Sequence, residues 1–259
     1  MGKWSAGNFD DLVLEGFSVP VEGWDFSWFR DRGTEQRPPW GYATLMDERM
    51  SAASRALDLQ TGGGEVLAGI SKPPPVLVAT EGWPPNVALA RRRLAPIGGE
   101  VVVVDDDADL PFADASFDLI VSRHPVTVRW DEVARVLSPG GTYLSQQIGA
   151  GEKRELREFM VGPRPIPDAR RPDRVVEAAS AAGLDVVDLR TDTQRVEFFD
   201  VAAVIVFLRK VIWHVPDLSV EKYRGKLLEL HNKIEMEGPF VTYSKRFLIE
   251  ARKPPWQAR

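Results

Sequence analysis

Apolar residues between positions 55 and 148 form short runs that alternate with helix-like segments. The runs occupy residues 56–59, 76–80, 100–104, 117–121 and 142–148. The run of four valines at residues 100–104 shows no alternation with polar residues, which is typical of a central parallel strand buried on both faces. Residues 86–94 and 130–137 have the pattern of helices. Strands that alternate with helices predict an α/β protein with a mostly parallel sheet and right-handed crossovers.

The pattern changes after Gly149, where helices and strands no longer alternate regularly. Helices are predicted at residues 152–160, 174–182, 201–213 and 220–237, and strands at residues 185–189, 196–199 and 243–251. The segment 201–213 is apolar throughout, which indicates a buried helix. We therefore expect one domain at residues 55–259, with a helical insertion at residues 200–238 before the last strand.

Residues 1–54 do not have the pattern of a strand–helix unit, apart from helix-like residues 43–53. Further along, a short helix is predicted at residues 65–70, after the glycine turn. Residues 1–54 are rich in aromatic residues, glycine and proline, and we expect them to form an N-terminal cap or lid. Its rings either plug one end of the core or line a substrate pocket, because aromatic side chains bury large areas in both situations.

Composition limits the function classes. The chain has 259 residues, a net charge of −5 and no cysteine. The acidic charge argues against a nucleic-acid partner, which normally meets a basic face. The lack of cysteine excludes disulfides and thiolate chemistry, and no histidine–carboxylate spacing indicates a metal site. No apolar run predicts a membrane span and the first residues do not resemble a signal peptide, so we expect a cytoplasmic protein without a membrane partner.

The chemistry-bearing residues follow the predicted strands, and ligands of open parallel sheets bind at the carboxyl ends of the strands. The first strand contains Asp58 and leads into a turn with Gly62 and Gly64. Glycine tolerates positive φ and leaves room for a ligand beside the main chain, so this turn suits a nucleotide-like ligand. Glu81 ends the second strand, where a carboxylate can accept both hydroxyls of a ribose. Its alternative role is that of a solvated loop acid.

The order of these residues resembles class I S-adenosylmethionine-dependent methyltransferases, in particular the small-molecule subgroup of type 11. The resemblance covers roughly residues 53–149. Its landmarks are Leu57-Asp58, Gly62 and Gly64, Glu81, the acids before Leu110-Pro111-Phe112, Phe117-Asp118-Leu119-Ile120-Val121, and Leu137-Ser-Pro-Gly-Gly141. It implies a Rossmann-like sheet of seven mostly parallel strands, with an antiparallel last strand and helices on both faces.

The resemblance also implies which residues hold S-adenosylmethionine. Asp58 and the turn would hold the methionine part, Glu81 the ribose, and Asp106 or Asp107 the adenine amine. Gln60 stands where the family has its first glycine, which is a departure from the motif. The residues assigned to the cofactor are Asp58, Gln60, Gly62, Gly64, Glu81, Gly82, Trp83, Asp106, Asp107, Ser122 and Arg123.

The implied reaction is in-line transfer of a methyl group to oxygen or nitrogen of a small, apolar or aromatic acceptor. His124 is the candidate general base because it follows the fourth strand of the unit, and its alternative role is to orient the loop before Pro125. The candidate acceptor contacts are Trp24, Trp28, Phe29, Trp40 and Phe199. Two alternatives remain: an RNA methyltransferase, and a protein that binds S-adenosylmethionine without transferring its methyl group.

Overall fold

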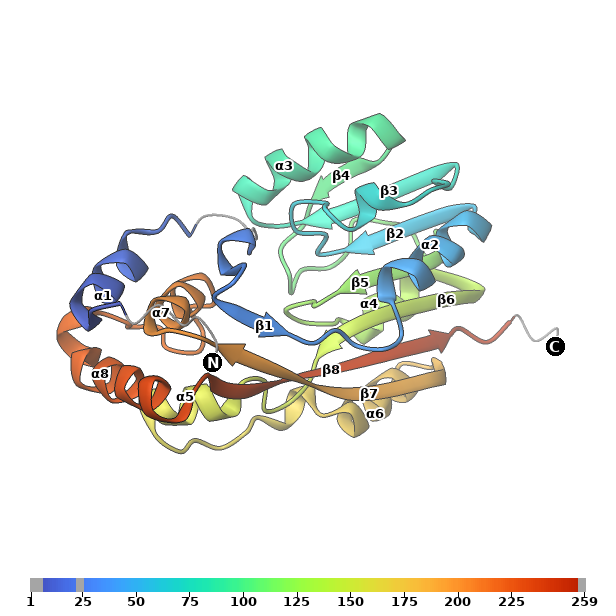
Figure 1. Cartoon of the computed structure of the whole chain (residues 1–259). Helices are drawn as coiled ribbons and strands as arrows, with labels where there is room; N and C mark the ends of the chain where they lie inside the picture. Colours follow the sequence, from blue (N-terminus) through green and yellow to red (C-terminus); the bar gives the residue numbers. More distant parts are fainter. Residues whose placement is uncertain (1–6, 22–25, 256–259) are drawn as a thin grey trace. The chain divides into compact units, whose positions relative to one another are not determined.

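The described residues form a mixed sheet of eight strands (Figure 1). The computed structural model describes residues 7–21 and 26–255. The strands are β1 (Gly33–Glu35), β2 (Arg55–Leu59), β3 (Val76–Glu81), β4 (Glu100–Val103), β5 (Phe117–Arg123), β6 (Leu137–Ile148), β7 (Asp185–Phe198) and β8 (Phe240–Arg252). Their order is β1-β7-β8-β6-β5-β2-β3-β4. The pairs among β2, β3, β4, β5 and β6 are parallel, whereas β8 is antiparallel to β6 and β1 to β7.

The predicted α/β fold is confirmed, and several local predictions need correction. The sheet has eight strands instead of seven, because β1 pairs with β7 in a segment where no strand was expected. The helix predicted at residues 65–70 is only a 3₁₀ turn at Leu67–Gly69, since three prolines at residues 73–75 stop it within two turns. The helix predicted at residues 201–213 ends at Lys210.

Eight helices are described: α1 (Phe9–Ser18), α2 (Tyr42–Ala52), α3 (Pro84–Leu94), α4 (Trp130–Val136), α5 (Arg154–Val161), α6 (Pro172–Ala181), α7 (Val201–Lys210) and α8 (Val220–Glu237). The helix α1 was not predicted. Its buried residues Phe9, Leu12, Val13 and Gly16 nevertheless have helical spacing, and the Asn8 side chain accepts a hydrogen bond from the Asp10 amide as an N-cap. No helix in the described ranges is long and apolar enough to cross a bilayer.

The valine-rich strand β4 was predicted to be a central strand. In the structure it is the edge strand beside β3. Val101 is buried, whereas Val103 is 55% exposed. The apolar run indicates a strand, but its position depends on the crossovers that order the sheet, and these are not encoded in the run itself.

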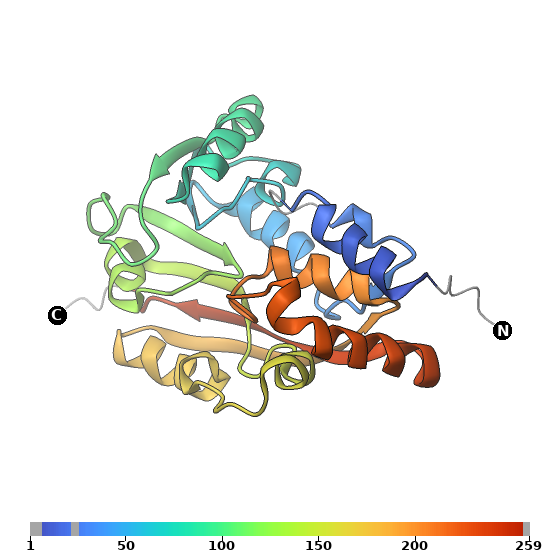
Figure 2. The same ribbon diagram turned by 90° about the vertical axis from the view of Figure 1, so that its left-hand side faces the viewer.

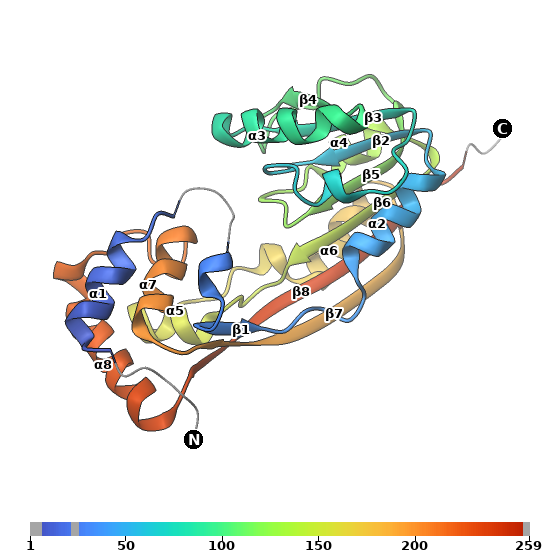
Figure 3. The ribbon, with the colours of Figure 1, turned by 45° about the horizontal axis from the view of Figure 1, so that its top comes forward.

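Clustering of contacts divides the chain into two compact units, and each is described by itself. The first unit comprises residues 1–37, 151–166 and 193–245. Its core is built on α7, where every residue from Val201 to Leu208 is buried. The helices α1 and α8 pack beside α7, as Figures 2 and 3 show. Residues 1–37 of the predicted cap and the predicted helical insertion therefore belong to the same unit, whereas residues 38–54 of the predicted cap belong to the second unit.

The second unit comprises residues 38–150, 167–192 and 246–259, and it contains the strands β2 to β6. Successive residues of β2 face opposite sides of the sheet: Ala56 packs in one apolar cluster and Leu57 in another. Helices α2 and α3 contribute to the cluster on the first face, and α4 and α6 to the cluster on the other. Helices thus cover both faces of this parallel sheet, as the sequence predicted.

Candidate functional site

The carboxyl ends of the parallel strands β2, β3, β4 and β5 meet at one edge of the second unit. The registers align Asp58 with Ala79 and with Val121, Leu59 with Ser122, and Glu81 with Val103. The turn at residues 60–64 follows β2 at this edge. The sheet therefore brings together the glycine turn and the acids that the sequence placed at strand ends.

Glu81 is fixed against the glycine turn by both of its carboxylate oxygens. Oε2 accepts a hydrogen bond from the Gly62 amide at 2.8 Å, and Oε1 accepts one from the Trp83 amide at 2.9 Å. The residue is only 7% exposed, and burial raises the pKa of its carboxyl. The Asn86 side chain also hydrogen-bonds to this carboxylate. Because each carboxylate oxygen has more than one acceptor site, acceptor capacity remains for a ligand. Glu81 is not the solvated loop acid of the alternative interpretation.

The three glycines assigned to the site have different physical roles. Gly62 has φ +65°, and a Cβ at this position would meet no atom of the described residues within 4 Å, so they leave open space beside the main chain. At Gly64 a Cβ would lie 3.3 Å from the Ala90 Cα, and at Gly82 it would lie 2.9 Å from the Val104 carbonyl oxygen. Gly62 therefore leaves room for a ligand, whereas the other two allow backbones to pack closely.

Gln60 occupies the position of the family's first glycine and still adopts a left-handed conformation, with φ +56°. Its side chain bridges to the loop after β5: Nε2 donates to the Thr127 carbonyl oxygen at 2.8 Å, and Oε1 accepts from the Val126 amide at 2.6 Å. The turn thus keeps the geometry of a glycine, and two hydrogen bonds offset the cost of a side chain in this conformation.

Variants of Gln60 will separate these two effects. Gln60→Ala removes both hydrogen bonds and keeps the left-handed cost, so we expect a loss of about 2 kcal/mol in the free energy of unfolding. Gln60→Gly also loses the bonds but relieves the backbone, and we expect about half that loss. Urea unfolding measures both. An alanine variant as stable as the glycine variant would contradict the backbone argument.

Asp58 and Tyr42 are two buried polar residues of the second unit. Asp58 is 6% exposed, and burial raises its pKa to about 7, with the Glu81 carboxylate adding to the effect. Among the described residues, the buried Tyr42 hydroxyl has no hydrogen-bond partner, and its pKa is raised by burial and then by the charge of Asp58. Since an unsatisfied buried hydroxyl is costly, Tyr42 fits a ligand that supplies the missing polar atom.

A pocket opens next to the turn between loops that follow β2, β4 and β5. Its lining residues include Gln60, Thr80, Asp105, Asp106, Pro125 and Thr127. Of the two aspartates predicted to meet the adenine amine, Asp106 lines the pocket and Asp107 is not among the lining residues. The pKa of Asp106 is raised by partial burial and by its neighbours Asp105 and Asp107. The gathered carboxylates suit a ligand that presents hydrogen-bond donors.

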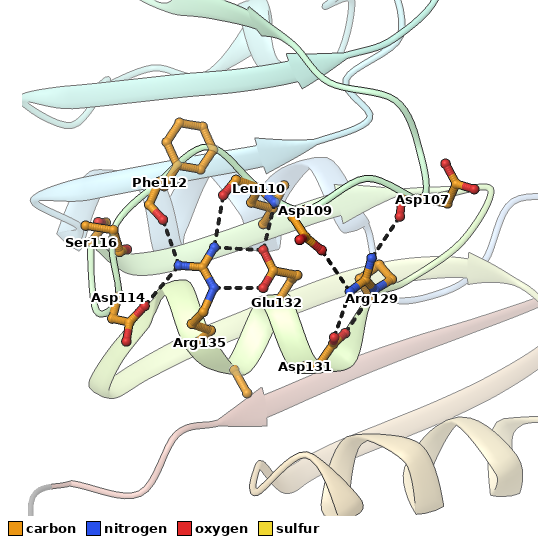
Figure 4. A network of polar contacts seen from close by, with 12 residues as sticks. Asp107, Asp109, Leu110, Phe112, Asp114, Ser116, Arg129, Asp131, Glu132 and Arg135 are labelled. Atoms are coloured by element: carbon orange, nitrogen blue, oxygen red, sulfur yellow. Dashed lines mark hydrogen bonds and ion pairs between the residues drawn. The ribbon is translucent and has the colours of Figure 1, made fainter.

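Two arginines hold the loops around this pocket in place (Figure 4). Arg129 donates to the Asp107 carbonyl oxygen at 2.8 Å and to the Asp109 carboxylate at 3.1 Å. Arg135 pairs with Glu132 at 2.7 Å, and the Glu132 carboxylate accepts from the Leu110 amide at 2.7 Å. These residues were not identified from the sequence. The signal was present, because Glu132 and Arg135 have i, i+3 spacing on a helix that packs beside the loop.

The predicted site residues at the end of β5, Ser122, Arg123 and His124, have different environments. Ser122 is fully buried, and its hydroxyl is hydrogen-bonded to Tyr143 at 2.9 Å and to Ser145 at 2.8 Å. Arg123 is exposed at the end of β5. His124 comes next with φ +57°, a conformation uncommon outside glycine, and its amide donates to the Gln146 carbonyl oxygen at 2.7 Å.

The aromatic residues predicted to contact an acceptor are not a single group. Trp40 is buried in the core of the second unit, and the exposed ring at this edge is Trp83, which is 52% exposed. Trp28 and Phe29 belong to the first unit, where their rings meet edge to face at 5.5 Å, and Phe199 is in the same unit. Trp24 lies outside the described residues. The acceptor contacts of these residues stay a prediction.

Comparison with known proteins gives matches that include this site. Residues 57–145 match the model of the family described as "Methyltransferase domain". The demethylmenaquinone methyltransferase of Clavibacter sepedonicus is 36% identical over 108 residues, which are 39% of this chain and 44% of that protein. The protein of the same name from Thermus thermophilus is 35% identical over 99 residues, 35% of this chain and 45% of that protein.

Among solved structures, the YcgJ protein of Bacillus subtilis aligns with a TM-score of 0.55 and 19% identity, over 83% of this chain and 99% of that one. This likeness shows the fold. The chain spans less than half the length of the curated relatives it matches. The family match begins in β2 and ends in β6, so it contains the glycine turn, Glu81 and His124.

Proposed function

We propose that this chain, which carries a class I methyltransferase domain at residues 57–145, transfers the methyl group of S-adenosylmethionine to a small, apolar or aromatic acceptor. The observation that carries the proposal is the geometry of Glu81. Its carboxylate is held by the Gly62 and Trp83 amides and keeps acceptor capacity for a ligand, beside a glycine with open space next to its main chain. A ribose with two neighbouring hydroxyls matches this arrangement.

The other residues of the site fit the rest of the cofactor. Asp58 and the unpartnered Tyr42 hydroxyl suit the charged amino acid end, where an ammonium and a carboxylate need partners. Asp106 lines the pocket and suits the amine of adenine. The exposed Trp83 ring offers a surface on which a base can stack.

S-adenosylmethionine supplies a methyl group that is already activated by the sulfonium. The protein mainly has to align the acceptor atom with the methyl group and to exclude water, and alignment alone can account for much of the acceleration. The residues that fix the turn and the loops, Glu81, Gln60 and Arg129, therefore act by orienting the cofactor.

An aromatic acceptor is supported by the names of the two curated relatives, which act on demethylmenaquinone. The acidic net charge of −5 argues against the alternative of an RNA acceptor. The further alternative, binding without transfer, differs from our proposal in activity and not in cofactor affinity.

Calorimetry with S-adenosylhomocysteine tests the cofactor site. We expect micromolar affinity for the parent and at least tenfold weaker binding for Glu81→Gln, because an amide cannot accept hydrogen bonds from both backbone amides and both hydroxyls (tenfold is about 1.4 kcal/mol). Glu65→Gln is the matched control: Glu65 adjoins the same turn but is exposed and pairs with Arg93. Absence of binding to the parent would overturn the proposed function, and equal affinity of the Glu81 variant would overturn the ribose assignment.

A further inference from the structure

Three side chains of the second unit form a hydrogen-bonded chain that ends on His124. The Trp40 indole Nε1 donates to Gln146 Oε1 at 2.8 Å, and Gln146 Nε2 lies 2.9 Å from His124 Nε2. Trp40 is 8% and Gln146 5% exposed, so water does not compete freely for these bonds. These hydrogen bonds link the segment before α2, the strand β6 and the end of β5.

The indole determines the direction of every hydrogen bond in this chain. An indole Nε1–H can only donate, so the Gln146 side chain has to present its oxygen to Trp40. The amide nitrogen then faces His124, and an amide NH₂ can only donate. A flipped amide would place its NH₂ against the indole N–H and leave both donors unsatisfied in a buried position, at a cost of about 1–3 kcal/mol for each group.

We infer that Trp40, acting through Gln146, holds His124 as the neutral tautomer that carries its proton on Nδ1. Nε2 has to accept the bond from Gln146, and a neutral imidazole has one donor and one acceptor nitrogen. Trp40 and Gln146 are thus positioning residues, and the Trp40 ring sets the state of the imidazole.

The backbone supports the same arrangement. The β5–β6 register pairs Arg123 with Gln146, so His124 follows directly beside the glutamine that binds its ring. The His124 amide donates to the Gln146 carbonyl oxygen, and the residue is held at φ +57°. A non-glycine residue in this conformation costs about 1–2 kcal/mol, and such strain is often found at functional sites.

The consequence for methyl transfer rests on the proposed function, whereas the tautomer does not. Because Nε2 accepts the hydrogen bond from Gln146, His124 cannot accept a proton there without breaking that bond, and Nδ1 already carries a proton. His124 therefore acts as a hydrogen-bond donor through Nδ1, and not as the general base that the sequence suggested.

Nitrogen-15 NMR of the histidine rings in the ligand-free protein tests the tautomer. Spectra recorded near pH 8.5, about two units above the ordinary histidine pKa of about 6.5, report the neutral ring. His124 is assigned by the signals lost in His124→Gln, since the chain has only three histidines. We expect a protonated Nδ1 and an unprotonated Nε2.

Two variants and one control complete the experiment. Gln146→Glu presents only acceptors, so it should move the His124 proton to Nε2, and Trp40→Phe should yield a mixture of both tautomers. Trp130→Phe removes another indole, which packs on Tyr143 and takes no part in the hydrogen bonds between Trp40, Gln146 and His124. This variant should leave the His124 signals unchanged. A parent protonated on Nε2, or a Trp40→Phe spectrum identical to that of the parent, would overturn the inference. Because binding of S-adenosylhomocysteine is measured separately, failure of the proposed function is distinguishable from failure of the tautomer.

Discussion

Replacing Glu132 with alanine is expected to lower the free energy of unfolding by about 3 kcal/mol. Glu132 accepts two hydrogen bonds from Arg135 and one from the Leu110 amide, all at 2.7 Å. Its side chain is only 9% exposed. Without it, the Leu110 amide loses its acceptor and the half-buried Arg135 guanidinium loses two hydrogen bonds, although it keeps those to the exposed Asp114 carboxylate and to the Phe112 and Leu110 carbonyl oxygens. Buried polar groups that lose their partners account for many of the largest mutational effects.

A second glutamate with the same spacing provides the control. Glu177 pairs with Arg174 at 2.7 Å and also has i, i+3 spacing, but its side chain is 63% exposed and that of Arg174 55%. Exposed pairs contribute about 0–1 kcal/mol, so Glu177→Ala should change stability by no more than about 0.5 kcal/mol. Urea unfolding at pH 7 measures both variants. Equal losses in the free energy of unfolding for the two variants would show that burial does not strengthen the contribution of Glu132 to stability.

The same network predicts a pH dependence of stability. Hydrogen bonds from Arg135 lower the pKa of the Glu132 carboxyl in the folded protein. Its contribution is therefore complete above the unfolded pKa of about 4.3 and is lost as the pH falls through the lower folded value. We expect the stability difference between the parent and Glu132→Ala to shrink when unfolding is measured below pH 4.3, because the Glu132 carboxyl of the parent becomes protonated there.

The parts of the site that could be predicted from sequence are those built by local chain geometry. Asp58, the glycine turn and Glu81 lie at the ends of apolar runs, and parallel strands bring such ends to one edge whatever the strand order. The helix α1 was also predictable from its Asn8 cap and its i, i+3, i+4 spacing, but the abundance of aromatic residues around it suggested an irregular segment.

The parts that could not be predicted depend on contacts between distant segments. Gln146 meets His124 only because of the β5–β6 register, and Trp40 reaches the same glutamine from 106 positions earlier in the chain. Tyr42 becomes notable only once its hydroxyl is seen to be buried without a partner. The edge position of β4 likewise follows from the strand order. Sequence patterns predict elements and their ends, whereas register and strand order decide which side chains meet.

Replacing Asp58 with asparagine is expected to have opposite effects on stability and on cofactor binding. In the unfolded chain the carboxyl has its ordinary pKa of about 3.9. Burial raises the pKa to about 7 in the folded protein. Between these values the folded state binds more protons than the unfolded state, so the stability of the parent falls as the pH rises from about 4 to about 7.

The size of the stability effect follows from the shift. Three pKa units correspond to about 4 kcal/mol at 1.36 kcal/mol per unit, which is an upper limit on the cost of keeping this carboxylate ionised. Asparagine has nearly the same shape and no charge to bury. We therefore expect Asp58→Asn to stabilise the ligand-free protein by about 2–4 kcal/mol at pH 8 and by much less at pH 5. Thermal and urea unfolding at the two pH values measure this difference.

Asp118→Asn is the matched control for stability. The Asp118 carboxylate accepts hydrogen bonds from the Ser54 amide at 2.9 Å and the Arg55 amide at 3.1 Å, so it makes bonds that an asparagine can only partly replace. We expect this variant to lose about 1 kcal/mol at pH 8. A similar gain in both variants would mean that the stabilisation does not come from the buried charge of Asp58.

Binding should change in the other direction. If Asp58 pairs with the ammonium group of the cofactor, its loss should weaken the affinity for S-adenosylhomocysteine at least 100-fold, or about 2.7 kcal/mol, because the ligand charge would be buried without its partner. The parent should bind more tightly at pH 8 than at pH 6, since Asp58 has to ionise, and Asp58→Asn should lose this dependence. Calorimetry at both pH values decides the point. A variant that is more stable and still binds with the parental affinity would place the ammonium elsewhere, whereas a stable variant that fails to bind would show that the protein tolerates a costly buried carboxylate because its ligand requires the charge.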